Sequence, residues 1–190
     1  MGRPATDKRE RLIAAAVVQF HHKGIDRSSL ADVANAAGVP PGNSYYYFQS
    51  KDDLTRSVIN EWDQHLSKYF ADLDLLPDPA ARVSAFLDKA LDRRSGYVAH
   101  GCPLNGLNYD LRRRQDATAG DGSRLYKIQL EWLRSQFGLL GMTSDKCDTW
   151  ARLFLSSIQG SLLLAYATDD PHYIDQTILE LRDGLATWLA

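Results

Sequence analysis

The stretch from residue 29 to residue 48 constrains this chain most, because it has the pattern of two short helices joined by a sharp turn. Ser29 followed three residues later by Asp32 is typical of a capping box at a helix start. Gly38 suits the position just past a helix end, and the pair Pro40-Pro41 can begin a helix but cannot continue one. This pattern predicts a helix-turn-helix, whose second helix enters the major groove of DNA. The alternative is an ordinary helical hairpin with a tyrosine-rich face.

Positions in and around this motif also carry a family resemblance: Phe20, Gly24, Ser29, Ala34, Gly38, Val39, Tyr45, Tyr47, Phe48, Ser50, Lys51 and Leu54. With these residues the chain resembles the tetracycline-repressor (TetR) family over about residues 6–66. The resemblance implies a DNA-binding N-terminal domain and a helical C-terminal domain that binds an effector and forms a dimer. The sequence departs from the family at Pro40, where a Ser or Thr usually caps the second helix. The start of that helix must therefore be stabilised in another way.

The predicted reading helix carries polar side chains that suit contact with DNA. An amide such as that of Asn43 can pair with adenine through a bidentate contact. The resemblance assigns Asn43 and Ser44 to bases, and Tyr45 and Lys51 to the phosphate backbone. Arg3 belongs either to an arm that enters a minor groove or to a disordered terminus. The predicted DNA-binding residues are Arg3, Arg27, Ser28, Ser29, Gly42, Asn43, Ser44, Tyr45, Tyr46 and Lys51.

Charge and composition are those of an ordinary globular protein rather than of a strongly basic one. The net charge is −2, but residues 1–60 carry +2 and residues 61–190 carry −4. Phosphate contacts must therefore be local. The two cysteines have no metal-ligand or disulfide spacing, which favours a cytoplasmic location without a metal, and the apolar run 153–167 is interrupted by polar residues, which argues against a membrane segment. With no phosphate loop or nucleophile motif, we expect neither a cofactor nor enzymatic activity.

Helical periodicity continues through the rest of the chain and predicts an all-α protein of about nine helices. We assign residues 1–50 to a three-helix DNA-binding domain that contains the motif at about 29–48. Residues 51–190 form the larger effector-binding and dimerisation domain.

The most unusual stretch of the second half runs from residue 100 to residue 109, where Cys102 precedes Pro103 at a predicted helix start. This resembles a branch of the family with Gly-Cys at the start of the sixth helix, some of whose members respond to electrophiles or oxidants. Cys102 is either such a reactive thiol or a packed cap without reactivity. We expect a largely apolar or aromatic effector in a cavity formed by Cys102, Asn105, Asn108, Tyr109, Trp132, Trp150 and Tyr166.

The last two predicted helices carry a ridge of small residues and an apolar seam, which suit a four-helix dimer interface. The alternative is that both helices only complete the core of the monomer. The predicted interface residues are Ser157, Ser161, Ile174, Ile178, Leu181 and Leu185.

These features together predict a homodimeric transcriptional regulator that binds double-stranded operator DNA and no membrane, most simply a repressor released by a small molecule. The rival hypothesis is a helical small-molecule-binding protein, or a redox or electrophile sensor that acts through Cys102.

Overall fold

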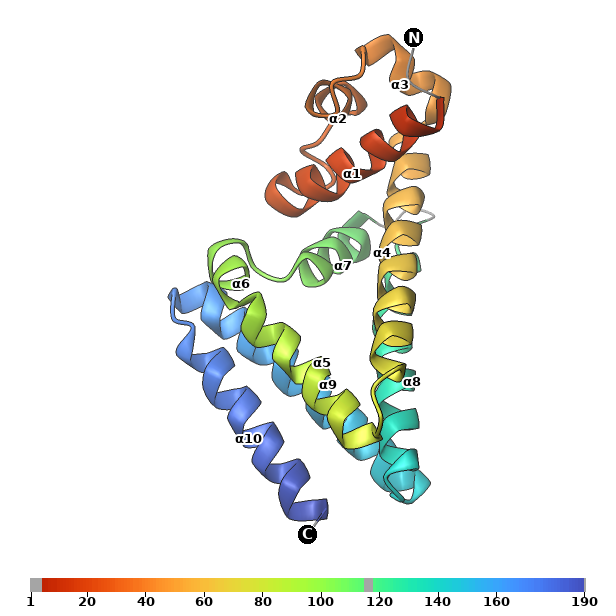
Figure 1. Cartoon of the computed structure of the whole chain (residues 1–190). Helices are drawn as coiled ribbons and strands as arrows, with labels where there is room; N and C mark the ends of the chain where they lie inside the picture. The colour runs from red at the N-terminus through yellow and green to blue at the C-terminus, as the bar shows by residue number, and fades with distance from the viewer. Residues whose placement is uncertain (1–4, 115–117, 190) are drawn as a thin grey trace. The chain divides into compact units, whose positions relative to one another are not determined.

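The computed structural model describes residues 5–114 and 118–189, and all regular secondary structure within these ranges is helical, which confirms the all-α prediction (Figure 1). Arg3 lies outside the described residues. Of the helices described, none is long and apolar enough to cross a membrane. The helices are α1 (Ala5–Lys23), α2 (Leu30–Ala36), α3 (Pro41–Tyr47), α4 (Lys51–Asp74), α5 (Pro79–Asp92), α6 (Arg94–His100), α7 (Pro103–Arg114), the 3-10 helix η1 (Asp121–Ser123), α8 (Arg124–Leu139), α9 (Ser144–Thr168) and α10 (His172–Leu189).

Helix α6 is the element that the sequence pattern did not predict. It is seven residues long, contains Gly96 and has no fully buried side chain, so it lacks a clear apolar stripe. It packs on α9 and ends at Gly101, whose φ of 73° leaves the helical region. A helix this short is marginal in isolation, and contact with a neighbouring helix therefore supports it.

The chain divides into two compact units. Unit 1 comprises residues 1–65 and 103–125, so it holds α1 to α3, the first part of α4, α7 and η1. Unit 2 comprises residues 66–102 and 126–190. This division by compactness differs from the predicted boundary after residue 50, because α7 and the start of α4 pack with the N-terminal helices. As a division by function, residues 1–50 and 51–190 stay a prediction.

Unit 1 is built around α1, which packs against α2 and α7, while α2 packs against α3. Apolar side chains at helical spacing point inward from each of these elements. Phe48, just past the end of α3, is 1% exposed and fills the centre together with the start of α4. The buried side chains include Leu12, Ala16, Phe20, Ile25, Val33, Ala34, Val39, Phe48, Leu54, Val58, Ile59, Leu107 and Leu111.

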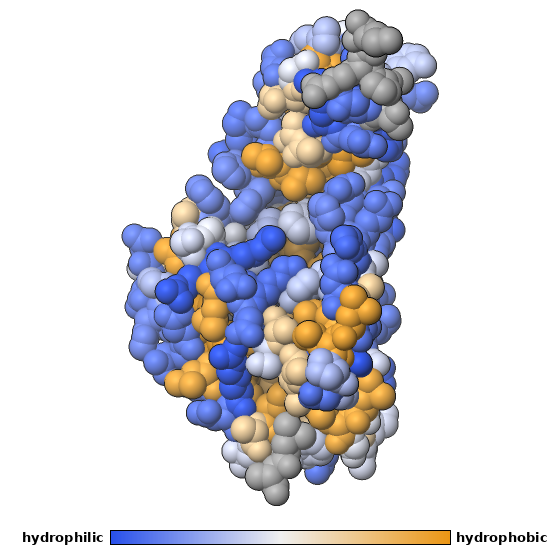
Figure 2. Space-filling view, viewed as in Figure 1, coloured by the Kyte–Doolittle hydropathy of each residue, from blue (hydrophilic) through white to orange (hydrophobic). Residues whose placement is uncertain are grey.

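Unit 2 has its core between α5, α9 and α10, where α10 packs on both of the other helices (Figure 1). Two aromatic clusters lie within it. The rings of Phe70 and Trp132 stack at 4.8 Å with Phe86 beside them, and Phe137 meets Phe154 edge to face at 5.1 Å. In the lower part of Figure 2, apolar residues of unit 2 reach the surface in patches separated by hydrophilic ones.

The predicted dimer contacts are wrong for five of the six residues. Ser161, Ile174, Ile178, Leu181 and Leu185 are each at most 7% exposed in the single chain, because this seam packs α10 against α9 and α5. Only Ser157 is half-buried. The monomer-core alternative therefore describes the seam correctly. The apolar side chains exposed on the two helices are different: Leu153, Leu163, Leu164, Tyr166, Tyr173 and Leu179.

Candidate nucleic-acid interface

The turn between α2 and α3 has the geometry that the sequence predicted. The Ser29 hydroxyl accepts the backbone N–H of Asp32 at 3.0 Å, and the Asp32 carboxylate accepts the N–H of Ser29 at 3.0 Å. Both halves of the capping box are thus present, and the hydrogen bonds from Ser29 lower the pKa of the Asp32 carboxyl. At the other end of α2, Gly38 has a φ of 62°, and the N–H of Val39 donates to the Ala34 carbonyl at 2.9 Å. This is a Schellman ending, which turns the chain sharply.

Helix α3 begins without a side-chain cap, as the departure at Pro40 predicted. The two prolines reduce the number of unsatisfied donors at this uncapped helix start, because neither Pro40 nor Pro41 has a backbone N–H group that needs an acceptor. The N–H of Asn43 donates to the Pro40 carbonyl at 2.8 Å. The start of the helix therefore has few unsatisfied donors, and its side chains are not needed as caps.

Four of the predicted contacts lie on the open side of α3. Gly42 and Asn43 are exposed, and the side chains of Tyr45 and Tyr46 are 61% and 83% exposed. A Cβ atom built at Gly42 meets nothing within 4 Å, so the backbone there is open to a close approach. Large exposed aromatic side chains on so small a helix are typical of a binding surface rather than of a core.

Two of the predicted contacts are wrong. Ser44 is 0% exposed and its hydroxyl donates to the Pro41 carbonyl at 2.6 Å. Ser28 is also 0% exposed, and its hydroxyl donates to the Gly24 carbonyl at 2.8 Å. Both side chains face the interior of unit 1, where their hydroxyls satisfy backbone carbonyls, and neither presents its side chain to a duplex.

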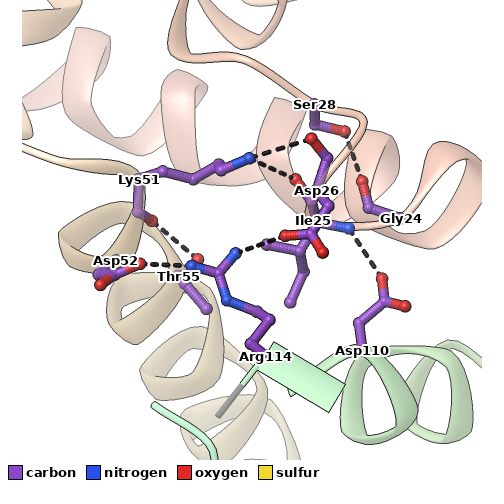
Figure 3. A network of polar contacts seen from close by, with 9 residues as sticks. All are labelled: Gly24, Ile25, Asp26, Ser28, Lys51, Asp52, Thr55, Asp110 and Arg114. Carbon is purple, nitrogen blue, oxygen red and sulfur yellow. Dashed lines mark hydrogen bonds and ion pairs between the residues drawn. The ribbon is translucent and has the colours of Figure 1, made fainter. Parts of the chain in front are cut away.

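Lys51 stands at the start of α4, as expected, but its ammonium group is already engaged. It donates to the backbone carbonyls of Ile25 and Asp26, each at 3.1 Å (Figure 3). An ammonium has three donors, so the same group can hold this loop and still meet a phosphate. Arg27 and Ser29 are exposed on the neighbouring segment.

Two arginines of α1 support the motif, although they are not among the residues predicted from the sequence. Arg11 donates to the carbonyls of Ala37 and Gly38, the second at 3.1 Å, and so satisfies the end of α2. Arg9 donates to the Ser57 hydroxyl at 3.1 Å, and its guanidinium lies over the Phe48 ring. Their partners are distant in sequence, so no local pattern could have revealed these contacts.

The residues predicted to bind an effector fall into both units. Asn105, Asn108 and Tyr109 belong to unit 1, where Tyr109 is 63% exposed with the Arg113 guanidinium over its ring. The Asn108 amide donates to the Leu104 carbonyl in its own helix at 3.1 Å. The predicted residues of unit 2 are Cys102, Trp132, Trp150 and Tyr166.

Within unit 2, Trp132 has a structural role. It is 8% exposed, stacks on Phe70 and donates its indole N–H to the Asp74 carboxylate at 3.0 Å. Trp150 lies beside Phe154 at 5.7 Å between ring centres. Tyr166 is different, because half of its surface is exposed and its ring lies next to Gly101, the neighbour of Cys102.

Two phenols near Cys102 and a half-buried lysine beside Tyr69 are not among the residues predicted from the sequence. Burial raises the pKa of Tyr97 to about 12, and the nearby Cys102 thiol adds to this shift. Burial also raises the pKa of Tyr126 above its ordinary value, again with a contribution from Cys102. The Lys89 ammonium lies 3.2 Å over the centre of the Tyr69 ring, and burial together with Arg93 lowers the pKa of Lys89 to about 8. The Lys89 ammonium and the Tyr69 ring thus form a cation–π contact within unit 2.

Comparisons with known proteins agree with this geometry. The family described as "Bacterial regulatory proteins, tetR family" matches residues 12–58. The HTH-type transcriptional regulator LmrA of Bacillus subtilis is 31% identical over 163 residues, which is 84% of this chain and 86% of that protein. The HTH-type transcriptional regulator TtgR of Pseudomonas putida is 34% identical over 129 residues, covering 62% of this chain and 61% of TtgR. A TetR transcriptional regulator from Legionella pneumophila has the same fold, with a TM-score of 0.83 at 20% identity, covering 97% of this chain and 99% of that one.

Proposed function

This chain belongs to the TetR family of DNA-binding transcriptional regulators, which are not enzymes, and we propose that it acts as a homodimeric repressor that leaves its operator when a small molecule binds. The observation that carries the proposal is the helix-turn-helix of unit 1. Its helix α3 exposes Asn43, Tyr45 and Tyr46 to solvent, while the apolar residues of the unit are buried. A protein that only binds a small ligand would not need these exposed side chains on a helix-turn-helix.

We assign the DNA contacts as follows. Asn43 reads a base edge through its amide, and Gly42 allows a phosphate or sugar to approach the backbone. Tyr45, Tyr46, Ser29 and Arg27 contact the backbone of the duplex with exposed hydroxyl or guanidinium groups. Lys51 keeps one N–H for a phosphate while it holds the loop carbonyls. Ser28 and Ser44 are not part of this set.

Asn43→Ala should relax the sequence preference at a single base position, at a cost of about 1–3 kcal/mol for the preferred base. The operator is first selected from a random DNA library with the wild-type protein, and binding is then measured by fluorescence anisotropy on every single-base variant. Asn35→Ala is the matched control, because it removes the same side chain from an exposed position of α2. An equal loss of affinity for all sequences would contradict a base-reading role of Asn43.

A dimer follows from the need to place two reading heads on two half-sites. We place the interface on the exposed face of α9 and α10, where Leu153, Leu164 and Leu179 are each about half exposed. Ser156, Gly160 and Ala167 lie on the same side of α9 as Leu153 and Leu164 at helical spacing, and all three are exposed. Small residues between leucines permit close approach of a second helix, so this face replaces the buried seam as the proposed contact.

We place the effector near Cys102 and Tyr166 in unit 2 and expect a small, largely aromatic compound. The largely buried phenols of Tyr97 and Tyr126, whose pKa values are both raised in part by Cys102, offer a few polar groups in apolar surroundings. In one version the compound binds noncovalently and favours the conformation that does not fit DNA. In the other, an electrophile modifies the Cys102 thiol.

We favour the noncovalent version and expect Cys102→Ser to respond like the wild type, whereas Tyr166→Ala should lose the response. Release of labelled operator DNA is measured with a panel of phenols and benzoates, and separately with N-ethylmaleimide as the electrophile. A Cys102 adduct seen by mass spectrometry, together with loss of operator binding that Cys102→Ser abolishes, would establish the covalent version instead.

A further inference from the structure

The loop between α1 and α2, residues 24–29, is held through its backbone by groups from other helices of unit 1 (Figure 3). Ile25 is 0% exposed, and its N–H donates to the Asp110 carboxylate of α7 at 2.8 Å. A buried N–H without a partner is strongly unfavourable, and Ile25 lies two residues past the end of α1, outside any helix that could supply an acceptor. Asp110 therefore supplies the acceptor that the loop itself lacks.

Arg114, one turn further along α7, ties the same loop to the start of α4. Its guanidinium is within 3.1 Å of the Asp26 carboxylate and 2.5 Å of the Asp52 carboxylate. The Arg114 side chain is only 9% exposed, whereas Asp26 is 75% exposed and Asp52 36%. Because exposed ion pairs contribute little to stability, the Arg114–Asp52 pair is stronger than the Arg114–Asp26 pair.

Lys51, the first residue of α4, also holds the loop. Its ammonium donates to the carbonyls of Ile25 and Asp26, and its own carbonyl accepts the Thr55 hydroxyl at 2.8 Å. The loop is thus fixed at an N–H by α7, at two carbonyls by α4, and at one side chain by Arg114. In Figure 3 these groups converge on the loop from two directions.

We propose that Asp110 and Arg114 are positioning residues for DNA binding, which hold the loop 24–29 against α4 so that Ser29, α2 and Lys51 keep the geometry that the duplex requires. The proposal rests on the DNA contacts proposed above, because neither residue is assigned a contact with DNA itself. The loop leads directly into Ser29, the N-cap of α2, and the Lys51 ammonium is set by the same carbonyls. Contacts to a duplex tolerate little displacement, so loosening this loop weakens reading without removing any reading side chain.

The test compares Arg114→Ala with Arg113→Ala. Arg113 is the adjacent residue of α7, is exposed and loses the same charge, but it lies over Tyr109 and outside the network. Operator affinity is measured as a function of salt concentration, and folding is checked by circular dichroism. We expect Arg114→Ala to bind the selected operator at least about tenfold more weakly than Arg113→Ala, with the wild-type salt dependence. Asp110→Ala should weaken binding likewise, and Asp110→Asn, which keeps an acceptor oxygen, should restore most of it.

Other outcomes would overturn the proposal or require a second variant. Equal operator affinity of Arg114→Ala and Arg113→Ala would overturn it, and so would a salt dependence shallower by about one phosphate contact, which would mean that Arg114 touches DNA directly. If Arg114→Ala does not fold, Arg114→Lys decides: a several-fold loss of affinity in a folded protein supports the role, and wild-type affinity refutes it. A wild-type protein without sequence-specific binding would refute the proposed DNA contacts as a whole, which separates that failure from the failure of this inference.

Discussion

Ile178→Glu should unfold the C-terminal unit rather than split a dimer. Ile178 is 1% exposed on α10, where it packs among α9 and α5. The change replaces a buried aliphatic side chain with a carboxylate that has no partner. It should lower the free energy of unfolding by more than about 4 kcal/mol. That is a large part of the roughly 5–15 kcal/mol that stabilises a folded protein. Far-UV circular dichroism on heating should show that the variant loses its helical signal at a lower temperature than the wild type and then aggregates.

Leu179→Glu is the matched experiment one residue further along α10. Leu179 is 52% exposed, so the carboxylate can stay in water and the fold should survive. On the proposed interface, however, the charge would be buried between two chains, and light scattering should report a monomer with weakened operator binding. A folded, thermally unchanged Ile178→Glu protein would contradict the packing described for α10. A Leu179→Glu protein that stays dimeric would place the interface elsewhere.

Gly24→Ala should destabilise unit 1 strongly for a change of one methyl group. Gly24 has a φ of 84°, and a Cβ built there would lie 2.9 Å from the Asp110 carboxylate oxygen. The left-handed conformation costs alanine roughly 1–2 kcal/mol. Displacing Asp110 also endangers its bond to the Ile25 N–H, which adds about 1–3 kcal/mol. Thermal unfolding followed by circular dichroism should shift by on the order of 10 °C.

Gly106→Ala is the control for that change within the same unit. Gly106 lies in α7, and a Cβ built there meets nothing within 4 Å. Glycine inside a helix is less favourable than alanine by about 0.5–1 kcal/mol, so this variant should be unchanged or slightly more stable. If Gly24→Ala proved as stable as Gly106→Ala, the loop conformation at residue 24 would be wrong.

The outcome for the predicted surface residues shows where sequence reasoning succeeds. Asn43, Tyr45 and Tyr46 were predicted as exposed because they are polar or amphipathic residues on a short helix, and they are exposed. Ser44 and Ser28 have the same polar character, yet they are buried. A serine hydroxyl can satisfy a backbone carbonyl one turn earlier, and so it enters a core without penalty. Residue type alone therefore cannot assign a serine to the surface.

The two C-terminal helices, α9 and α10, show where prediction from apolar periodicity fails. Both α9 and α10 carry apolar residues around much of their circumference, so periodicity gives two possible inward faces. The apolar pattern predicts Ile178 and Leu181 at the contact with a partner chain, whereas the fold uses that seam for its own core and leaves Leu153, Leu164 and Leu179 exposed. The choice depends on the position of α5, which is distant in sequence from both helices.

The sequence by itself determined the helix-turn-helix, because the signals that specify it act within a few residues. The capping box of Ser29 and Asp32, the left-handed Gly38 and the donor-free start at Pro40-Pro41 are local features, and each is present as predicted. Only the tertiary structure decided that Asp110 and Arg114 support the loop before α2, because their partners lie more than 60 residues away in the sequence. Local hydrogen bonding is encoded in short patterns, but contacts between distant segments arise only when the whole core is packed.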